Sequence, residues 1–588
     1  MTLRRDRLSL LLSEVGPVNP LPPVAGLLDP PYALDFSDVP PHIARGAAYG
    51  GVRTVFPYLL QDGYRRAPRL STVDGVVLEN PFVRATFLPG LGGRLWSLVD
   101  RATGRELLFR PEVLQPANLA LRGAWFAGGV EWNIGTRGHC PFTCDPLHAA
   151  VVTRPDGTQA LRMWEYERMR GVVFQVDAWL PPDSPVLLVG VRIRNPGAET
   201  VPVYWWSNAA VPQTPETVVR APADTAFLAS YTGRVERVPA RDLVPGRQIK
   251  AVDYFYEVPD EVEQPWVEAV GGLVQASTGR LRGRKLFCWG ETVGGRHWQE
   301  WLGGGAYCEI QAGLATTQYE HLPLPGGESW SWVESYGPVP PGDLSSALEV
   351  FEETADLPVG EGLCVGSGWG ALEDRLTPGI STAATPFTTT GPEQAPWVAL
   401  LDAGFLPVGD PVSYVAGEHW RKLLESSPQN WAVAYHLGVM AHAEGDAETA
   451  RVRYLESLAH KDTSWALRAL GVLDGSADLL VAAHGMDPYR WQLAVEAVGA
   501  LLAAGRAAEA LAFVDGLPES VRSHGRLRLA EVRASLAAGA PGRAAEVLRS
   551  GFEVDDLREG EVSLDALWAQ ACPDDPLPAR YDFRMKPV

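Results

Sequence analysis

Apolar and polar residues alternate with a period of two in several short segments of the first part of the chain. Residues 82–88, 186–193, 201–206 and 329–333 are the clearest examples. Gly and Pro separate such segments, as at Pro89-Gly90. Alternation of this kind is typical of strands with one buried face, and many short strands joined by Gly and Pro turns are typical of a large antiparallel sandwich. We therefore predict an antiparallel β-sandwich over residues 1–354.

The pattern changes at the end of this region. Gly, Pro, Ser and Thr dominate residues 355–397, most clearly in the segment 384–391. Such composition is typical of a connector rather than of a strand or a helix. Trp369 and Leu372 interrupt it with large apolar side chains, which predicts that the connector packs onto a domain.

Residues 398–588 are predicted to be a helical domain, because most of this region is rich in Ala and Leu. Gly505 and Gly539 each precede a similar helical stretch and lie 34 positions apart, which is the tetratricopeptide period; alignment on Gly542 instead gives 37 positions. Five further residues fall close to the spacing of that repeat: Trp431, Leu437, Gly438, Ala450 and Tyr454. A groove for a protein partner, self-association and a helical cap without a ligand all fit this pattern.

Length and charge exclude several classes of protein. A chain of 588 residues is too long for one core, so two or three domains are expected. The net charge of −20 argues against binding to nucleic acid or to an anionic membrane. We identify no signal peptide, no apolar run long enough to span a bilayer, and only 6 cysteines, so we predict a cytoplasmic protein with reduced thiols.

Two glutamates stand in strand-like segments that are otherwise apolar and aromatic. Glu131 lies within residues 126–133, and Glu309 lies within residues 306–312. Charged side chains rarely occupy such places without a partner or a chemical task. A pair of carboxylates suits general acid/base chemistry on a sugar. The alternative is that either glutamate forms a salt bridge with an arginine such as Arg94 or Arg137.

The segments 88–100 and 103–108 resemble the opening strands of galactose-mutarotase-like domains. Gly128-Gly129 resembles the Gly-Gly turn that follows in sugar mutarotases. Residues 308–311, with 324–328 downstream, resemble the segment that carries the catalytic glutamate of that superfamily. The resemblance implies a β-supersandwich, a carbohydrate ligand and a general base at Glu309.

The similarity is closer to a less characterised branch, in which a mutarotase-like domain is joined to tetratricopeptide-like helices. The Gly-Gly-Val-Glu-aromatic-Asn pattern of that branch resembles residues 128–133. Mutarotases carry a histidine acid in an Asn-His-aromatic segment, whereas residues 204–210 contain no histidine. We therefore expect Glu131 to supply the acid in place of that histidine.

His139 follows Glu131 by eight residues and is a further catalytic candidate, since a histidine in the same cleft could orient a hydroxyl or carry a proton. A hydrogen-bonded loop histidine is the alternative. His139, Cys140, Cys144 and His148 are also zinc-ligand types, but the adjacency of His139 and Cys140 makes joint tetrahedral ligation awkward. We predict no metal, and without a P-loop or dinucleotide motif we predict no cofactor.

Of the 20 tryptophans, 13 lie between Trp96 and Trp332, inside the predicted sandwich. Indole faces suit the C–H faces of sugars and indole N–H groups suit hydroxyls, although core packing must account for many of them. The tryptophans predicted to line a sugar site are Trp132, Trp205, Trp206, Trp298 and Trp301. The polar side chains predicted to contact the substrate are Asn133, Asn208, Gln311 and Arg94.

Together these features predict a carbohydrate-active enzyme that is mainly β with a helical C-terminal domain. The favoured reaction is glycoside hydrolysis on oligosaccharides, with Glu131 as general acid and Glu309 as general base or nucleophile. An aldose epimerase that uses the same carboxylates is the alternative within enzymes. A sugar-binding scaffold that recruits a protein through its helical repeats is the alternative without catalysis.

Overall fold

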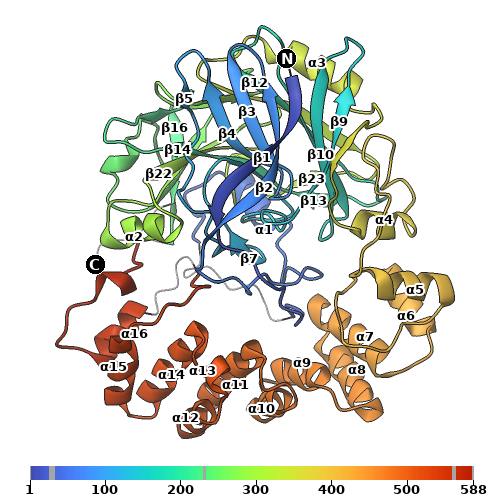
Figure 1. Ribbon diagram of the computed structural model, residues 1–588, viewed down its shortest axis with the longest axis vertical. Coiled ribbons are helices and arrows are strands. Elements are labelled where there is room, and N and C mark those ends of the chain that lie inside the picture. The colour runs from blue at the N-terminus through green and yellow to red at the C-terminus, as the bar shows by residue number, and fades with distance from the viewer. Residues whose placement is uncertain (1, 25–33, 230–232, 559–563, 586–588) are drawn as a thin grey trace.

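The computed structural model describes residues 2–24, 34–229, 233–558 and 564–585. Two large antiparallel sheets form the N-terminal part, and a curved row of helices follows along one side of them (Figure 1). The predicted fold class, mainly β followed by tetratricopeptide-like helices, is confirmed. Segment 201–206 is split, because Tyr204 interrupts the pairing between two strands.

The larger sheet contains 12 strands among the described residues. Its order is β1-β2-β3-β4-β8-β14-β22-β21-β18-β16-β17, with β5 paired to β4. The strands are β1 (Thr2–Leu12), β2 (Arg69–Glu79), β3 (Val83–Leu88), β4 (Arg94–Asp100), β5 (Arg105–Glu106), β8 (Val130–Ile134), β14 (Trp205–Pro212), β16 (Thr225–Ala229), β17 (Val235–Pro239), β18 (Val252–Glu257), β21 (Gly283–Cys288) and β22 (Tyr307–Gly313).

The second sheet has the order β15-β19-β20-β24-β12-β11-β10-β9-β25. Its strands are β9 (His148–Thr153), β10 (Gln159–Glu167), β11 (Val172–Trp179), β12 (Leu187–Arg194), β15 (Val219–Arg220), β19 (Trp266–Ala269), β20 (Val274–Ser277), β24 (Ser329–Gly337) and β25 (Gly362–Cys364). Two small two-stranded sheets complete the β structure among the described residues, namely β6 (Ala117–Ala120) with β7 (Gly123–Trp125), and β13 (Val201–Val203) with β23 (Leu322–Leu324).

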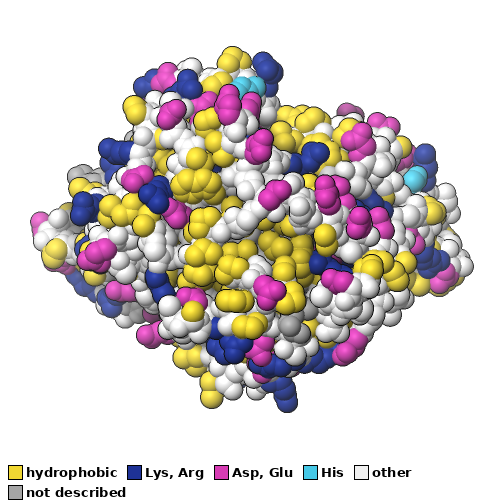
Figure 2. All heavy atoms as spheres, turned by 90° about the horizontal axis from the view of Figure 1, so that it is seen from above, with side chains coloured by type: hydrophobic (Ala, Val, Ile, Leu, Met, Phe, Trp, Pro, Cys, Tyr) yellow, Lys and Arg dark blue, Asp and Glu magenta, His cyan; other side chains and the backbone are white. Residues whose placement is uncertain are grey.

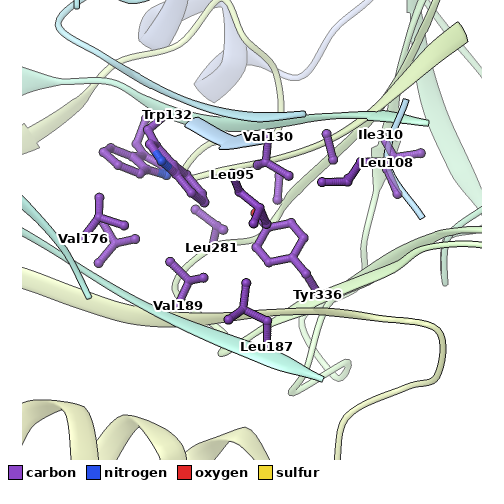
Figure 3. Close-up of a cluster of buried hydrophobic side chains, with 14 of the residues drawn as sticks. Leu95, Leu108, Val130, Trp132, Val176, Leu187, Val189, Leu281, Ile310 and Tyr336 are labelled. Carbon is purple, nitrogen blue, oxygen red and sulfur yellow. The ribbon is translucent and has the colours of Figure 1, made fainter. Parts of the chain in front are cut away.

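The main hydrophobic core fills the space between the two large sheets (Figure 3). Val130, Leu95 and Ile310 reach into it from the larger sheet, and Val176 and Val189 reach into it from the second sheet. Side chains alternate between the two faces of a strand. The residues next to Val130, Leu95 and Ile310 in their strands therefore face away from this core.

Short helices and one strand connect the sandwich to the helical domain. They are α3 (Leu344–Thr354), β25 and α4 (Trp369–Asp374); α1 (Pro41–Ala48) and α2 (Val293–Trp301) lie earlier, within the sandwich region. β25 pairs with β9, so the connector adds an edge strand to the second sheet. Trp369 and Leu372 are buried, and the Arg168 guanidinium lies 3.4 Å from the Trp369 ring centre. The connector is therefore packed against the sandwich.

The C-terminal helices form antiparallel pairs. Gly438 on α7 faces Tyr454 on α8, and a Cβ at Gly438 would lie 2.6 Å from that ring, so only glycine permits this approach. Gly505 and Gly539 both adopt positive φ, at 72° and 74°, directly after a helix, as helix-ending glycines do. The helices are α5 (Ala395–Ala403), α6 (Glu418–Ser426), α7 (Trp431–Glu444), α8 (Ala447–His460), α9 (Ser464–Asp474), α10 (Ala477–Met486), α11 (Trp491–Ala503), α12 (Ala507–Asp515), α13 (Glu519–Arg522), α14 (Gly525–Ala537), α15 (Pro541–Ser550) and α16 (Leu564–Ala571).

The helical domain contacts the sandwich region in its middle and at its end. Gln492 on α11 donates to Asp62 over 3.1 Å. At the C-terminal end, the indole N–H of Trp298 on α2 donates to the Phe583 carbonyl over 3.2 Å, and the Ala251 amide donates to the Met585 carbonyl over 3.0 Å. The last described residues therefore lie beside α2, as Figure 1 shows.

The surface mixes charges of both signs. On the face seen in Figure 2, Lys and Arg are interspersed with Asp and Glu around a central hydrophobic area. Among the described residues, no helix combines the length and the apolar character needed to cross a membrane.

Candidate active site

Glu131, Asn208 and Glu309 lie on three neighbouring strands of the larger sheet. β14 runs between β8 and β22, with Asn208 opposite both Glu131 and Gln311, and with Ala210 opposite Glu309. Directly paired positions, and positions two residues apart, share one face of a sheet. Glu131, Asn208 and Glu309 therefore share one face of the larger sheet, and this face is turned away from the intersheet core. With usual strand spacings, the Cα atoms of the two glutamates lie about 12 Å apart on that face.

Glu131 is buried among hydrogen-bond donors. Its Oε2 accepts from the Arg94 guanidinium over 2.9 Å and from the Trp125 indole over 2.6 Å. Its Oε1 accepts from the Asn133 amide over 2.8 Å and contacts Nδ1 of His139. Burial alone would raise the pKa of Glu131, but the charges of His139 and Arg94 outweigh it and lower the pKa to about 2.

This environment corrects the role predicted for Glu131. A general acid must hold a proton at the working pH, whereas Glu131 is an ionised carboxylate whose oxygens accept from several donors. It resembles the buried carboxylate that orients a catalytic histidine in other enzymes. The salt bridge to Arg94, the alternative that the sequence leaves open, is the arrangement found.

Arg94 does not fit the predicted role in substrate binding. Its side chain is 2% exposed and donates to the Gly128 carbonyl over 2.7 Å and to the Thr143 hydroxyl over 2.7 Å, besides Glu131. Its guanidinium also lies 4.1 Å from the Phe126 ring centre. Arg94 therefore holds Glu131 and the neighbouring loops in place.

His139 is the most solvent-accessible member of the group. Its side chain is 21% exposed, against 5% for Glu131. The loop that carries it is fixed by a bridge between Ala120 and His139, and the imidazole lies 4.8 Å from the Trp125 ring, centre to centre. Glu131 thus orients a histidine that remains partly open to solvent.

Glu309 is as buried as Glu131 but has a different environment. Among the described residues its carboxylate accepts one hydrogen bond, from the Gln311 amide over 2.7 Å. Burial raises the pKa of Glu309; the negative charge of Glu131 raises it further, and the charges of His139 and Lys285 offset part of the shift. A buried carboxyl with a raised pKa holds its proton more readily than an ordinary glutamate, as acid/base catalysts often do.

A chain of polar side chains extends from Glu309 across the sheet face. Gln318 donates to Gln311, Lys285 donates to Gln318, and Lys285 also pairs with Asp253. Sequence reasoning missed Lys285, Gln318 and Asp253. The signal for Lys285 was weak, because it stands beside Arg284 in residues 283–288, so no single charge stands out there as Glu309 does in 306–312.

The amide side chains that were predicted to contact the substrate form hydrogen bonds with the two glutamates. Asn133 donates to Glu131 and accepts from the Cys140 amide over 2.7 Å, so both ends of its side chain are occupied. Asn208 donates to Glu131 over 3.3 Å. Its Oδ1 is buried, and within the described residues it has no hydrogen-bond partner, so Asn208 is the amide best placed to accept a bond from a ligand hydroxyl.

Trp132 and Trp205 were wrongly predicted to line a sugar site. Both face the intersheet core, where their rings are stacked 6.5 Å apart, and Figure 3 shows Trp132 among the core side chains. Because Glu131 points to the opposite face, the adjacent Trp132 must point into the core. The same alternation separates Trp205 from Asn208.

The other three tryptophans that were predicted to line a sugar site are also packed against neighbouring residues. Trp206 lies on the site face but is 1% exposed, and a Cβ at Gly313 would lie 2.2 Å from its ring. Trp298 and Trp301 belong to α2 and pack against Phe583 of the C-terminal segment. Two other aromatic residues adjoin the carboxylates: Trp125 donates to Glu131, and Phe287 on β21 lies opposite Glu309 in the strand register.

The residues considered as zinc ligands make separate contacts. Cys144 donates to the Ala124 carbonyl over 3.4 Å, and Nε2 of His148 lies 2.9 Å from the Ser367 carbonyl. Burial raises the pKa of Cys140 to about 12, which favours the thiol over the thiolate that metals bind. In the ranges that the structure describes, no three His, Cys, Asp or Glu residues are grouped so that they could hold a metal ion.

Comparison with known proteins agrees with this architecture. Residues 51–326 match a family model described as a domain of unknown function, DUF5107. A crystal structure of a TPR-domain containing protein from Parabacteroides distasonis ATCC 8503 is similar over 99% of this chain and 97% of its own, with 20% identity and a TM-score of 0.73. The sandwich and the helices therefore occur together in another protein with the same overall fold.

Galactose mutarotase-like proteins are among the structural neighbours of the N-terminal part. One from Lactobacillus casei ATCC 334 matches 45% of this chain and 99% of its own, with 11% identity and a TM-score of 0.32. A putative aldose 1-epimerase from Escherichia coli K12 matches 44% of this chain and 97% of its own, with 14% identity and a TM-score of 0.32.

Proposed function

We propose that this protein is a carbohydrate-active enzyme that moves protons at the anomeric centre of a sugar, most simply as an aldose epimerase. The observation that carries the proposal is that Glu131 and Glu309 share one sheet face, where the ionised Glu131 holds His139 from a neighbouring loop and Glu309 has a raised pKa. Two groups that can exchange protons, in different environments, are what acid/base catalysis requires.

In this proposal Glu309 removes the proton of the anomeric hydroxyl while His139 donates a proton to the ring oxygen. The bond between the anomeric carbon and the ring oxygen breaks, and a free carbonyl forms. Rotation of the carbonyl and the reverse proton transfers then close the ring as the other anomer. Glu131 fixes the orientation of the imidazole and stabilises its positive charge, without itself exchanging a proton.

The sequence favoured glycoside hydrolysis, but the site supports that reaction less well. Hydrolysis as predicted needs Glu131 as the acid, and its low pKa and many donors oppose that role. One observation keeps hydrolysis as a second candidate, because the raised pKa of Glu309 suits a general acid as well as a base. Release of reducing ends from oligosaccharides would favour it.

The direct test is anomer exchange, followed by polarimetry or proton NMR on freshly dissolved α-D-galactose and α-D-glucose. We expect the full-length protein to accelerate exchange, and we expect His139→Asn to remove most of that acceleration. His148→Asn is the matched control, because His148 is a buried histidine that contacts the Ser367 carbonyl under the connector. Binding of a sugar without anomer exchange or cleavage would contradict the proposed enzymatic function and would favour a sugar-binding scaffold.

The helical domain adds a separate proposal. Its paired helices are suited to binding a protein partner or a second copy of the chain, as tetratricopeptide-like repeats are. Size-exclusion chromatography with light scattering tests self-association directly. We further propose a cytoplasmic location, which fractionation of the source cells would test.

A further inference from the structure

The side of the helical row that faces the sandwich is in contact with a proline-rich segment of the same chain. In Figure 1, α7, α9 and α11 lie nearer to the sheets than α8, α10 and α12 do, and blue loops of the N-terminal part lie between the sheets and the helices. Residues 19–24, Asn-Pro-Leu-Pro-Pro-Val, lie in this part of the chain and form neither a helix nor a strand. We call residues 19–24 the proline segment.

The apolar side chains of the proline segment are buried in a hydrophobic cluster to which the helical domain contributes most members. Leu21 and Val24 are 3% and 1% exposed. They share this cluster with Tyr414, which precedes α6, with Tyr435 on α7 and with Trp465 on α9. A segment without regular structure thus buries two side chains as completely as the helices bury their own.

The helical domain also supplies hydrogen-bond donors to the backbone of the proline segment. The Tyr414 hydroxyl donates to the Pro20 carbonyl over 3.2 Å, and the Arg468 guanidinium donates to the Pro22 carbonyl over 2.8 Å. Proline has no backbone N–H, so a segment with three prolines in six residues offers mainly acceptors. A surface that presents donors between aromatic rings is complementary to such a backbone.

These donors are held in place by contacts within the helical domain. Arg468 on α9 is 5% exposed and donates twice to the carboxylate of Glu496 on α11, over 2.6 and 2.9 Å. The Tyr414 hydroxyl lies 3.1 Å from the Tyr435 hydroxyl. A bidentate pair fixes the plane of a guanidinium, so the N–H that reaches Pro22 has a fixed direction.

We propose that this face of the helical domain is a binding site for a short proline-rich peptide, and that the chain fills the site with its own residues 19–24. A partner protein would displace the proline segment with a segment of the same chemistry, in which apolar side chains stand between prolines. The proposal rests on the partner-binding role proposed for the helical domain. It adds the class of partner and the contact that occupies the site in its absence.

The covalent link makes the proline segment a strong competitor of any free peptide. A linked ligand acts at an effective concentration in the millimolar range. A free peptide should therefore bind the wild type weakly. Removal of the two buried apolar side chains should release the segment and open the site.

Fluorescence anisotropy with a labelled peptide of residues 17–24 tests the proposal on the full-length protein. We expect Leu21→Ser/Val24→Ser to bind this peptide with a Kd below about 1 mM, and the wild type to bind it at least about tenfold more weakly. Leu70→Ser is the matched control, because Leu70 is 75% exposed and lies outside the segment. This control should bind the peptide as weakly as the wild type does.

Two altered peptides define what the site recognises. A peptide with Ser in place of both Leu21 and Val24 should have a Kd above about 10 mM for the double variant. A peptide with Ala in place of all three prolines should bind at least about threefold more weakly, because the proline rings restrict the conformations of the free peptide.

Two further substitutions in the double variant locate the bound peptide. Arg468→Lys keeps a positive charge beside Glu496 but lacks the guanidinium fork, and it should weaken binding by about threefold or more. Arg451→Gln should leave binding unchanged, because it removes an exposed ion pair with Asp474, in which Arg451 is 46% exposed.

Several results would overturn the proposal: no binding of the peptide to the double variant, equal affinity for the double variant and the wild type, equal affinity for the alanine peptide, or unchanged binding in Arg468→Lys. If the double variant does not fold alone, an excess of the peptide should restore its circular dichroism and cooperative unfolding, and no restoration would overturn the proposal equally. These results are separate from self-association and from anomer exchange. A protein that stays monomeric in light scattering keeps the proposal if its double variant binds the peptide.

Discussion

Glu131 and Glu309 lie on the same face of one sheet and are almost equally buried, at 4% and 5% exposure. Arg94, Trp125, Asn133, Asn208 and His139 all contact the Glu131 carboxylate, whereas Glu309 accepts from Gln311. The pKa of the first is lowered and that of the second is raised. Donors and neighbouring charges, rather than burial, therefore decide which carboxyl can exchange protons.

The largest expected effect is on turnover. Glu309→Gln should lower the rate of anomer exchange by about 100-fold or more, because a positioned acid/base group contributes at least that factor. Glu334→Gln is the matched control: Glu334 is a fully buried glutamate with a raised pKa on β24, and it accepts from Ser207 and Tyr336 on the core side. If Glu309→Gln and Glu334→Gln exchanged anomers at equal rates, Glu309 would have no role in the mechanism.

The next effect is on stability. Arg94→Met should lower the free energy of unfolding by about 3–5 kcal/mol, because it leaves the buried Glu131 charge without its guanidinium partner. Arg7→Gln breaks an exposed ion pair with Asp74, at 3.7 Å and with side chains 79% and 92% exposed, and should change nothing measurable. Chemical denaturation compares the stability of Arg94→Met and Arg7→Gln. Equal stability of the two variants would mean that the buried charge of Glu131 does not need Arg94 to stabilise it.

The third effect is the pH dependence of stability, which should have opposite signs for the two glutamates. The folded-state pKa of Glu131, about 2, lies below the ordinary value of 4.5. Its ionised form therefore stabilises the fold above pH 4.5, and this contribution, on the order of 3 kcal/mol, is lost as the pH falls from 4.5 toward 2. The stability advantage of the wild type over Glu131→Gln should shrink over that window.

For Glu309 the folded-state pKa is raised, so the protonated form stabilises the fold below pH 4.5, and this contribution is lost as the pH rises through the folded-state value. Glu309→Gln should therefore be at least as stable as the wild type at neutral pH. Denaturation curves at several pH values measure both variants. Parallel pH profiles for Glu131→Gln and Glu309→Gln would contradict the difference between the two sites.

The smallest effect concerns Asn208. Its Oδ1, which has no partner in the described part of the chain, is expected to accept a bond from a sugar hydroxyl, so Asn208→Ala should raise KM by about three- to tenfold, with a smaller change in kcat. Asn195→Ala is the control, because Asn195 is a buried amide that donates to the Glu199 and Leu324 backbone carbonyls and has no contact with either glutamate among the described residues. An unchanged KM in Asn208→Ala would exclude Asn208 from substrate binding.

Much of the fold could be predicted from local pattern. Alternation located strands such as β3, β12 and β24, and the 34-residue spacing of Gly505 and Gly539 located helix ends. The same alternation, applied within one strand, would have excluded Trp132 from the site, because its neighbour Glu131 points the other way. That error came from weighing tryptophans by type rather than by face.

The site could be predicted only in part. Glu131 and Glu309 stood out because a charge in an apolar strand needs a reason, whereas Lys285 lies next to Arg284 in residues 283–288 and did not stand out. The sequence named Arg94 as a possible partner of Glu131, but the full set of donors could not be predicted, because side chains such as Thr143 reach the carboxylate from other segments of the chain. The pKa of a buried carboxyl depends on such tertiary contacts, so its chemical role cannot be assigned from residue type.

The most direct test of the central difference is carboxyl-carbon NMR of the protein labelled with ¹³C at glutamate Cδ, with Glu131→Gln and Glu309→Gln assigning the two signals by their loss. We predict that the Glu131 signal does not move between about pH 4 and pH 9, and that the Glu309 signal titrates with a midpoint above the ordinary value of 4.5. If both signals titrate together in the ordinary glutamate range, the division of roles proposed for this site is wrong.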